Sequence, residues 1–241
     1  LIIAVQPLTN FSFSDIEVKE INNIYCLTSD SLNQIKTFLK RIMKVLVILH
    51  NKGYCHGSIS CDCIFTDSNN EAILGGFEKT CCKYTDDNQI KYDILSVALV
   101  FLSIINLRYI EAIHQNVNVS RDNKYQIAKK LIASSDPLLY DLMIEMTCDD
   151  LNERSTPSEA LKHPFFLTSD KKLDVFSRAN LFLQSQSSRD NSVLYQFDSK
   201  SLEIVGSNWF NLIDEEMMND AQNYCDYNNQ SAADLVRLIR N

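Results

Sequence analysis

One stretch, residues 48–78, constrains the fold of this 241-residue chain more than any other. An amphipathic helical pattern runs into it, and Gly53 then supplies a tight turn. Two short apolar runs follow at 64–65 and 72–74, and the polar residues 67–70 lie between them. The sequence therefore predicts a helix, a turn, a loop and two paired strands, in that order.

This order resembles the catalytic-loop region of a protein kinase C-terminal lobe. Kinases carry H-R-D-L-K-P-E-N at this place and D-F-G after the hairpin, whereas this chain reads H-G-S-I-S-C-D-C and then G-F-E. His56 and Phe77 keep the kinase residue type, and because both pack internally in kinases, we expect structural roles for them. The resemblance implies a mainly α fold, with a kinase-like C-terminal lobe over residues 1–166.

The residues that carry phosphoryl transfer in kinases are replaced in this chain. Ser58 stands where kinases have the Asp that receives the substrate proton, and a neutral hydroxyl is a poor base. Ser60 stands at the Lys that steadies the phosphate, and Cys63, a soft ligand, stands at an Asn that binds the hard cation Mg²⁺. Gly76, or Gly75 one position earlier, stands at the metal-binding Asp of D-F-G. We therefore expect neither kinase activity nor Mg²⁺-dependent ATP binding, although both belong to the ancestral fold.

Further segments extend the resemblance toward the N-terminus. Residues 1–5 are expected to form the last strand of the kinase N-lobe, so most of that lobe lies outside this sequence. Residues 9–30 are polar and predicted to be irregular. Apolar residues then recur at helical spacing up to Leu49, which predicts a long amphipathic helix with Ser31 as its N-cap.

Two charged residues are predicted to have structural roles in the kinase-like lobe. By resemblance, Asp93 accepts hydrogen bonds from the backbone of the catalytic loop. Arg154 matches the Arg that pairs with the Glu of the kinase A-P-E motif, and because this chain lacks that motif, the partner of Arg154 stays open. Thr156 or Ser155 is expected to cap a helix that begins at Pro157.

Composition excludes some classes of function. The net charge of −8 gives no global basic field, so any contact with RNA must come from a local patch. The longest apolar run, 97–105, is shorter than the ~20 residues that span a bilayer, so we expect a buried helix and no membrane contact from this segment. The chain starts with Leu, has no signal peptide and is expected to be a piece of a longer protein.

The cysteine pattern favours a reducing compartment over a disulfide or metal framework. The eight cysteines include no C-x-x-C pair, and a domain of this size needs no disulfide. Cys55, His56, Cys61 and Cys63 lie close in sequence, but their spacing matches no standard zinc pattern, so no metal site is expected. His163 is expected to be a packed histidine at a helix end rather than a ligand.

The last part of the chain, residues 167–241, extends beyond the usual end of a kinase domain. Helices are predicted over 173–183, 193–197, 211–224 and 231–241. The stretches W-F-N-L-I-D and Y-C-D-Y-N-N-Q-S-A-A-D-L-V-R-L-I-R-N resemble an all-α kinase-extension nuclease module. Such modules occur in the inositol-requiring enzyme family, whose members are kinase/endoribonucleases that sense endoplasmic-reticulum stress, and in RNase L.

The resemblance implies metal-independent RNA cleavage, in which the 2′-hydroxyl attacks the neighbouring phosphate. By position, Tyr227 matches the active-site Tyr, Arg240 the phosphate-binding Arg and Asn241 the Asn that positions the substrate. Arg237 lies with Arg240 on the polar side of the last helix, and an exposed Arg pair beside a Tyr suits a phosphate. The general-acid His of the family is expected about one helical turn beyond Asn241.

Two functions from different classes stay open. The first is an endoribonuclease of the unfolded-protein-response sensor and RNase L type, which acts on RNA as a homodimer. The second is a non-catalytic interaction or scaffold domain that descends from that family. The resemblance places either of them in the cytoplasm or on the cytosolic face of the endoplasmic reticulum. Whether the chain is an enzyme depends on the His expected after Asn241.

Overall fold

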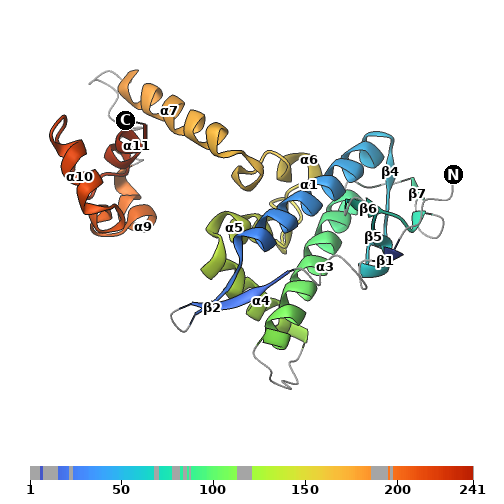
Figure 1. Ribbon diagram of the computed structural model, residues 1–241. Helices are drawn as coiled ribbons and strands as arrows, with labels where there is room; N and C mark the ends of the chain where they lie inside the picture. Colours follow the sequence, from blue (N-terminus) through green and yellow to red (C-terminus); the bar gives the residue numbers. More distant parts are fainter. Residues whose placement is uncertain are drawn as a thin grey trace. The chain divides into compact units, whose positions relative to one another are not determined.

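The computed structural model describes residues 6–7, 16–21, 24–67, 71–77, 82–83, 86, 88–112, 121–185, 195 and 198–240. It divides into two compact units, Leu1–Phe166 and Leu167–Asn241, which are treated separately below. Helices dominate both units in Figure 1, and the few strands are short. The predicted mainly α fold class is confirmed.

The first unit contains short strands and longer helices. The strands are β1 (Gln6–Pro7), β2 (Val18–Ile21), β3 (Ile24–Leu27), β4 (Tyr54–Cys55), β5 (Ile64–Thr66), β6 (Ala72–Leu74) and β7 (Cys82–Lys83). The α-helices are α1 (Ser29–Asn51), α3 (Asn88–Ala112), α4 (Arg121–Ser135), α5 (Pro137–Met146) and α6 (Pro157–Ala160), and the 3₁₀ turns are η2 (Cys61–Cys63) and η3 (Pro164–Phe166). Strands β1, β5 and β6 form one antiparallel sheet, β2 pairs with β3, and β4 pairs with β7.

The N-terminal region is more ordered than predicted. The expected strand over residues 1–5 lies outside the described residues, and Gln6–Pro7 form β1 instead. Residues Val18–Ile21 and Ile24–Leu27, predicted to be irregular, pair as the antiparallel strands β2 and β3, with Ile21 opposite Ile24.

Helix α1 starts earlier than predicted because its cap is Thr28, not Ser31. Thr28 has an extended backbone, and its hydroxyl accepts a hydrogen bond from the Ser31 backbone N–H. The buried Ser31 hydroxyl accepts a hydrogen bond from the Glu17 N–H at 2.7 Å, which ties the helix to the preceding chain. The apolar face of α1 is buried as predicted, with Ile35, Phe38, Leu39, Ile42, Met43 and Leu46 in the core.

Helix α3 is the apolar centre of the first unit. In Figure 1 it lies beside α1, and the fully buried residues of α3 are Ile94, Val97, Ala98, Phe101, Leu102 and Ile105. By length and mean hydropathy, Asn88–Tyr109 would be long and apolar enough to cross a membrane, although its longest uninterrupted apolar run stays shorter than ~20 residues. Half of its most apolar part is buried in the fold, and such core packing also selects an apolar composition.

The second unit is a small helical cluster. Its elements are α7 (Ser169–Ser185), α9 (Ser201–Val205), η4 (Trp209–Leu212), α10 (Glu215–Gln222) and α11 (Ala232–Arg240). The helix predicted over 211–224 is divided, because Asp214 caps α10 by accepting the Glu216 and Met217 N–H groups. The helix predicted over 193–197 lies largely outside the described residues. Fully buried Trp209 packs with Met218 and Leu238 in the small core.

Candidate functional site

The remnant of the catalytic loop is anchored by Asp93 of α3. Its carboxylate accepts the backbone N–H groups of His56 and Gly57, both at 2.8 Å. Nε2 of His50, at the end of α1, lies 2.9 Å from the same carboxylate. These are the backbone contacts expected for Asp93, and they hold the loop in place.

Cys63 packs between the loop after His56 and Gly76. Its thiol donates to the carbonyl of Ser58 over 3.4 Å, and its Sγ lies 3.6 Å from the Ser60 hydroxyl. Gly76 faces it with a φ of +82°, and a Cβ on Gly76 would lie only 2.8 Å from the Cys63 sulfur. The loop therefore packs a thiol and a glycine together where a kinase holds oxygen ligands for Mg²⁺.

His56 is buried, and Phe77 packs on it at the surface of the first unit. His56 is fully buried, and its Nε2 lies 2.8 Å from the carbonyl oxygen of Gly75. Phe77 packs on the His56 ring with centroids 5.2 Å apart, yet 36% of Phe77 is exposed. Phe77 therefore makes a structural contact with His56 while part of its side chain stays exposed.

Arg154 has replaced its lost glutamate partner by backbone carbonyls. Its Nε donates to the Cys148 carbonyl over 2.7 Å, and a terminal nitrogen donates to the Lys91 carbonyl over 3.3 Å. The guanidinium carbon also lies 5.8 Å from the Tyr92 ring centroid. The buried Arg154 thus joins the start of α3 to the segment before α6 and has a structural role.

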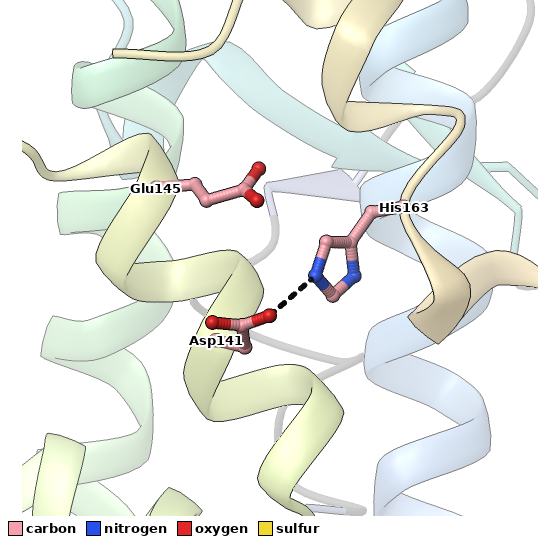
Figure 2. Close-up of side chains that lie close together, drawn as sticks. All are labelled: Asp141, Glu145 and His163. Atoms are coloured by element: carbon pink, nitrogen blue, oxygen red, sulfur yellow. Dashed lines mark hydrogen bonds and ion pairs between the residues drawn. The ribbon is translucent and has the colours of Figure 1, made fainter. Parts of the chain in front are cut away.

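Figure 2 shows the one group of three potential metal ligands found among the described residues: Asp141, Glu145 and His163. Nδ1 of His163 accepts the Phe165 N–H over 3.1 Å, so its proton lies on Nε2 and is donated to Asp141 over 3.2 Å. A metal ion would need the lone pair of that same Nε2. The geometry favours the packed histidine that the sequence predicted.

The cysteines near His56 do not form a metal centre with it in the described part of the chain. Burial, and then the charge of Asp62, raise the pKa of the Cys61 thiol. A raised pKa disfavours the thiolate, which is the form that binds metals.

The second unit contains a pocket of about 480 Å³ that brings Tyr227 and Arg240 together. Its lining comprises Met217, Asp220, Ala221, Tyr224, Tyr227, Leu238 and Arg240. Within the described residues, the exposed Arg240 guanidinium has no hydrogen bond or ion pair. Asn241, the third residue predicted for this site, lies outside the described residues.

Arg237, the other arginine on the polar side of this helix, makes its contacts with the loop that carries Tyr227 and with its own helix. Its guanidinium carbon lies 4.8 Å from the Tyr227 ring centroid, and its charge pairs with Asp234 at 3.2 Å. It also donates to the carbonyl of Asp226. These contacts use Arg237 to hold the Tyr227 ring, which leaves Arg240 as the arginine that can bind a ligand in this pocket.

A set of polar contacts that the sequence did not predict fixes the loop that carries Tyr227. Asp234 accepts the Asn228 N–H over 2.7 Å, and the Trp209 indole donates to the carbonyls of Asn228 and Ser231. Asp198 accepts the Ser231 hydroxyl at 3.0 Å at the start of α11. The spacing of Ser231 and Asp234 resembles an S-x-x-D cap and could have identified part of this set.

Comparisons with known proteins identify relatives for parts of the chain. Residues 174–241 match the family model described as Ribonuclease 2-5A. The kinase-extension nuclease module is the part of the chain that this match covers.

A curated relative extends the likeness beyond that module. The serine/threonine-protein kinase/endoribonuclease ire-1 of Caenorhabditis elegans is 26% identical over 153 residues. The match covers 62% of this chain but 16% of that protein's length. The chain therefore combines a kinase-like region with a kinase-extension nuclease module and resembles the inositol-requiring enzyme and RNase L proteins.

Among solved structures, the chain is similar to a divergent kinase that lacks the glycine-rich loop and regulates membrane ultrastructure of the Toxoplasma parasitophorous vacuole. The identity is 21% and the TM-score 0.39, with 57% of this chain and 45% of the other chain covered.

Proposed function

We propose that this chain is part of an endoribonuclease whose kinase-like region has lost phosphoryl transfer. The observation that carries the proposal is the pocket in which Arg240 and Tyr227 lie together. The match of residues 174–241 to a ribonuclease family supports the same function. RNA is the substrate class, and cleavage proceeds by attack of a 2′-hydroxyl on the adjacent phosphate.

Arg240 is suited to the charge that this reaction develops. A guanidinium presents N–H donors in a planar fork and can bind two phosphate oxygens at once. No other partner in the described region competes for those donors, so they are available to the phosphorane that forms in the transition state. Tyr227, held by Arg237, presents its phenol to the same pocket.

The kinase-like region is proposed to act as a support rather than as a catalyst. Ser58 offers no base, and the Cys63 sulfur fills the space beside Gly76. We infer that the region binds no Mg²⁺-ATP and that its well-packed core stabilises the chain. By likeness to the family, dimerisation and the cytosolic face of the endoplasmic reticulum are part of the proposal.

The test uses the longest natural form of the protein with a stem-loop RNA in EDTA. The proposal predicts products with 2′,3′-cyclic phosphate ends, and Arg240→Ala and Tyr227→Phe should both abolish them. Arg178→Ala is a matched control because Arg178 lies on α7 in an exposed ion pair with Asp174. A lack of cleavage at high protein concentration would instead favour the non-catalytic scaffold and direct attention to binding partners.

A further inference from the structure

The pocket has two chemically different walls. Arg240 of α11 and Tyr227 supply a cation and a phenol. The other wall comes from α10 and the turn after it, where Met217, Asp220, Ala221 and Tyr224 follow one another at helical spacing. These four residues, which we call the α10 wall, lie on one helix face. Phosphate chemistry does not need this wall, so it calls for a separate explanation.

Tyr224 is the most exposed large side chain of the α10 wall. It is 84% exposed and Met217 is 55% exposed, although both line the pocket. Exposing a flat aromatic face beside a phosphate-binding arginine has a common use in RNA recognition. An unpaired base stacks on the ring while the backbone phosphate is held by the cation.

Asp220 indicates which way round a nucleotide would lie in the pocket. A carboxylate repels phosphate, so the phosphate belongs on the Arg240 side of the pocket. A carboxylate also accepts hydrogen bonds from the exocyclic amino groups of adenine, cytosine and guanine. Uracil has no amino group, and its one ring N–H on the pairing edge is flanked by two carbonyl oxygens that would lie unfavourably close to the Asp220 oxygens.

We propose that the α10 wall is a nucleobase subsite, in which Tyr224 stacks an unpaired base and Asp220 selects bases with an amino group over uracil. The inference rests on the proposed function, because it takes RNA as the ligand. The pocket volume of about 480 Å³ falls in the range of roughly 300–1,000 Å³ found for small-ligand sites, which leaves room for one nucleotide.

The experiment measures binding separately from cleavage. Four stem-loop RNAs differ only in the base at the cleavage position and carry a 2′-deoxyribose there, so that no attack can occur. Their Kd values for the natural protein are measured by fluorescence anisotropy. Tyr224→Ala should weaken binding by about 5- to 150-fold, the range expected for the loss of one stacked base, whereas Tyr224→Phe should bind like wild type.

Two further variants make the test specific. Tyr195→Ala removes another tyrosine of the second unit that is 74% exposed but lies outside the lining, and it should leave Kd unchanged. Wild type should bind the uracil RNA more weakly than the other three, and Asp220→Asn should reduce that difference because an amide offers uracil a donor.

The outcomes separate the two proposals. If Arg240→Ala abolishes binding while Tyr224→Ala binds normally, or if Asp220→Asn keeps the discrimination against uracil, the subsite is refuted and the nuclease proposal stands. If wild type binds none of the RNAs, both are refuted. Thermal melting of each variant checks folding, and because Tyr224 and Asp220 are exposed, their melting temperatures should equal that of wild type.

Discussion

Arg237 lies over the ring of Tyr227, with 4.8 Å between its guanidinium carbon and the ring centroid. The same guanidinium pairs with Asp234 and binds the carbonyl of Asp226. Two arginines three residues apart on one helix therefore have different tasks: Arg237 supports the tyrosine, and Arg240 is available to a ligand. The first prediction follows from this difference.

Arg237→Ala should lower both stability and RNA cleavage, whereas Arg240→Ala should lower only cleavage. Loss of the Arg237 contacts removes a cation–π pair and charged hydrogen bonds, which together are worth about 1–3 kcal/mol. Urea unfolding and cleavage rates measure the two effects. Arg178→Ala, on the exposed face of α7, should change neither. Equal stability losses in Arg237→Ala and Arg240→Ala would contradict the assignment.

The helix pattern placed both arginines on one face but could not separate their roles. The spacing of residues along α11 determines which helix face the two arginines share. Asp226 and Tyr227, the partners of Arg237, come from a loop whose path depends on tertiary contacts such as the Trp209 indole bonds. Arg154 gives a similar case. The kinase-like pattern identified the position of Arg154. Its partners are backbone carbonyls, which leave no sequence signature, so the sequence could not predict them.

Asp93→Ala should strongly destabilise the first unit. Its buried carboxylate accepts two backbone N–H groups, and removing it leaves both donors without a partner at a cost of about 1–3 kcal/mol each. Urea denaturation measures the loss. Asp62→Ala changes an exposed carboxylate in the same region and should cost under about 0.5 kcal/mol. A loss at Asp93 as small as that of the control would show that the loop does not depend on this anchor.

Gly76→Ala should destabilise the protein more than Gly53→Ala. The two glycines have nearly the same positive φ, +82° and +79°, but only at Gly76 would a Cβ meet a close neighbour, the Cys63 sulfur at 2.8 Å. Backbone strain of about 1–2 kcal/mol is common to both substitutions, so the difference between them measures the steric contact. Thermal or urea unfolding provides both values.

A second substitution measures how much of the stability loss comes from the Cys63 sulfur. Adding Cys63→Ala to Gly76→Ala should recover most of the extra loss, because the atom in conflict with the new Cβ is gone. Gly76→Asp alone should give no thermal shift with Mg²⁺-ATP. A clear Mg²⁺-dependent shift in wild type would overturn the proposal that nucleotide binding is lost.

Glu159 should make a small contribution to stability that is lost in acid. Hydrogen bonds from the Thr156 backbone and hydroxyl lower the pKa of Glu159, so the unfolded chain takes up a proton at a higher pH than the folded one does. Stability from this capping box is therefore complete above the ordinary Glu pKa of about 4.3 and falls as the pH drops below it.

The size of this effect is modest because the Glu159 carboxylate is largely exposed. We expect about 0.5 kcal/mol, measured as the difference in unfolding free energy between pH 6 and pH 3 for wild type and Glu159→Gln. Glu153→Gln, an exposed residue outside the capping box, is the matched control. An identical pH dependence in wild type and Glu159→Gln would contradict the role of this cap.

The contact between Gly76 and Cys63 also limits which substitutions these two positions can accept. A mutation that returns a carboxylate to position 76 meets the thiol first, and a lone change at position 63 leaves a gap beside the glycine. Either single change is expected to lower stability, so a carboxylate at position 76 needs a matched change at position 63. The packing of the Cys63 sulfur therefore disfavours a larger side chain at position 76. Natural variation at positions 63 and 76 is expected to be correlated.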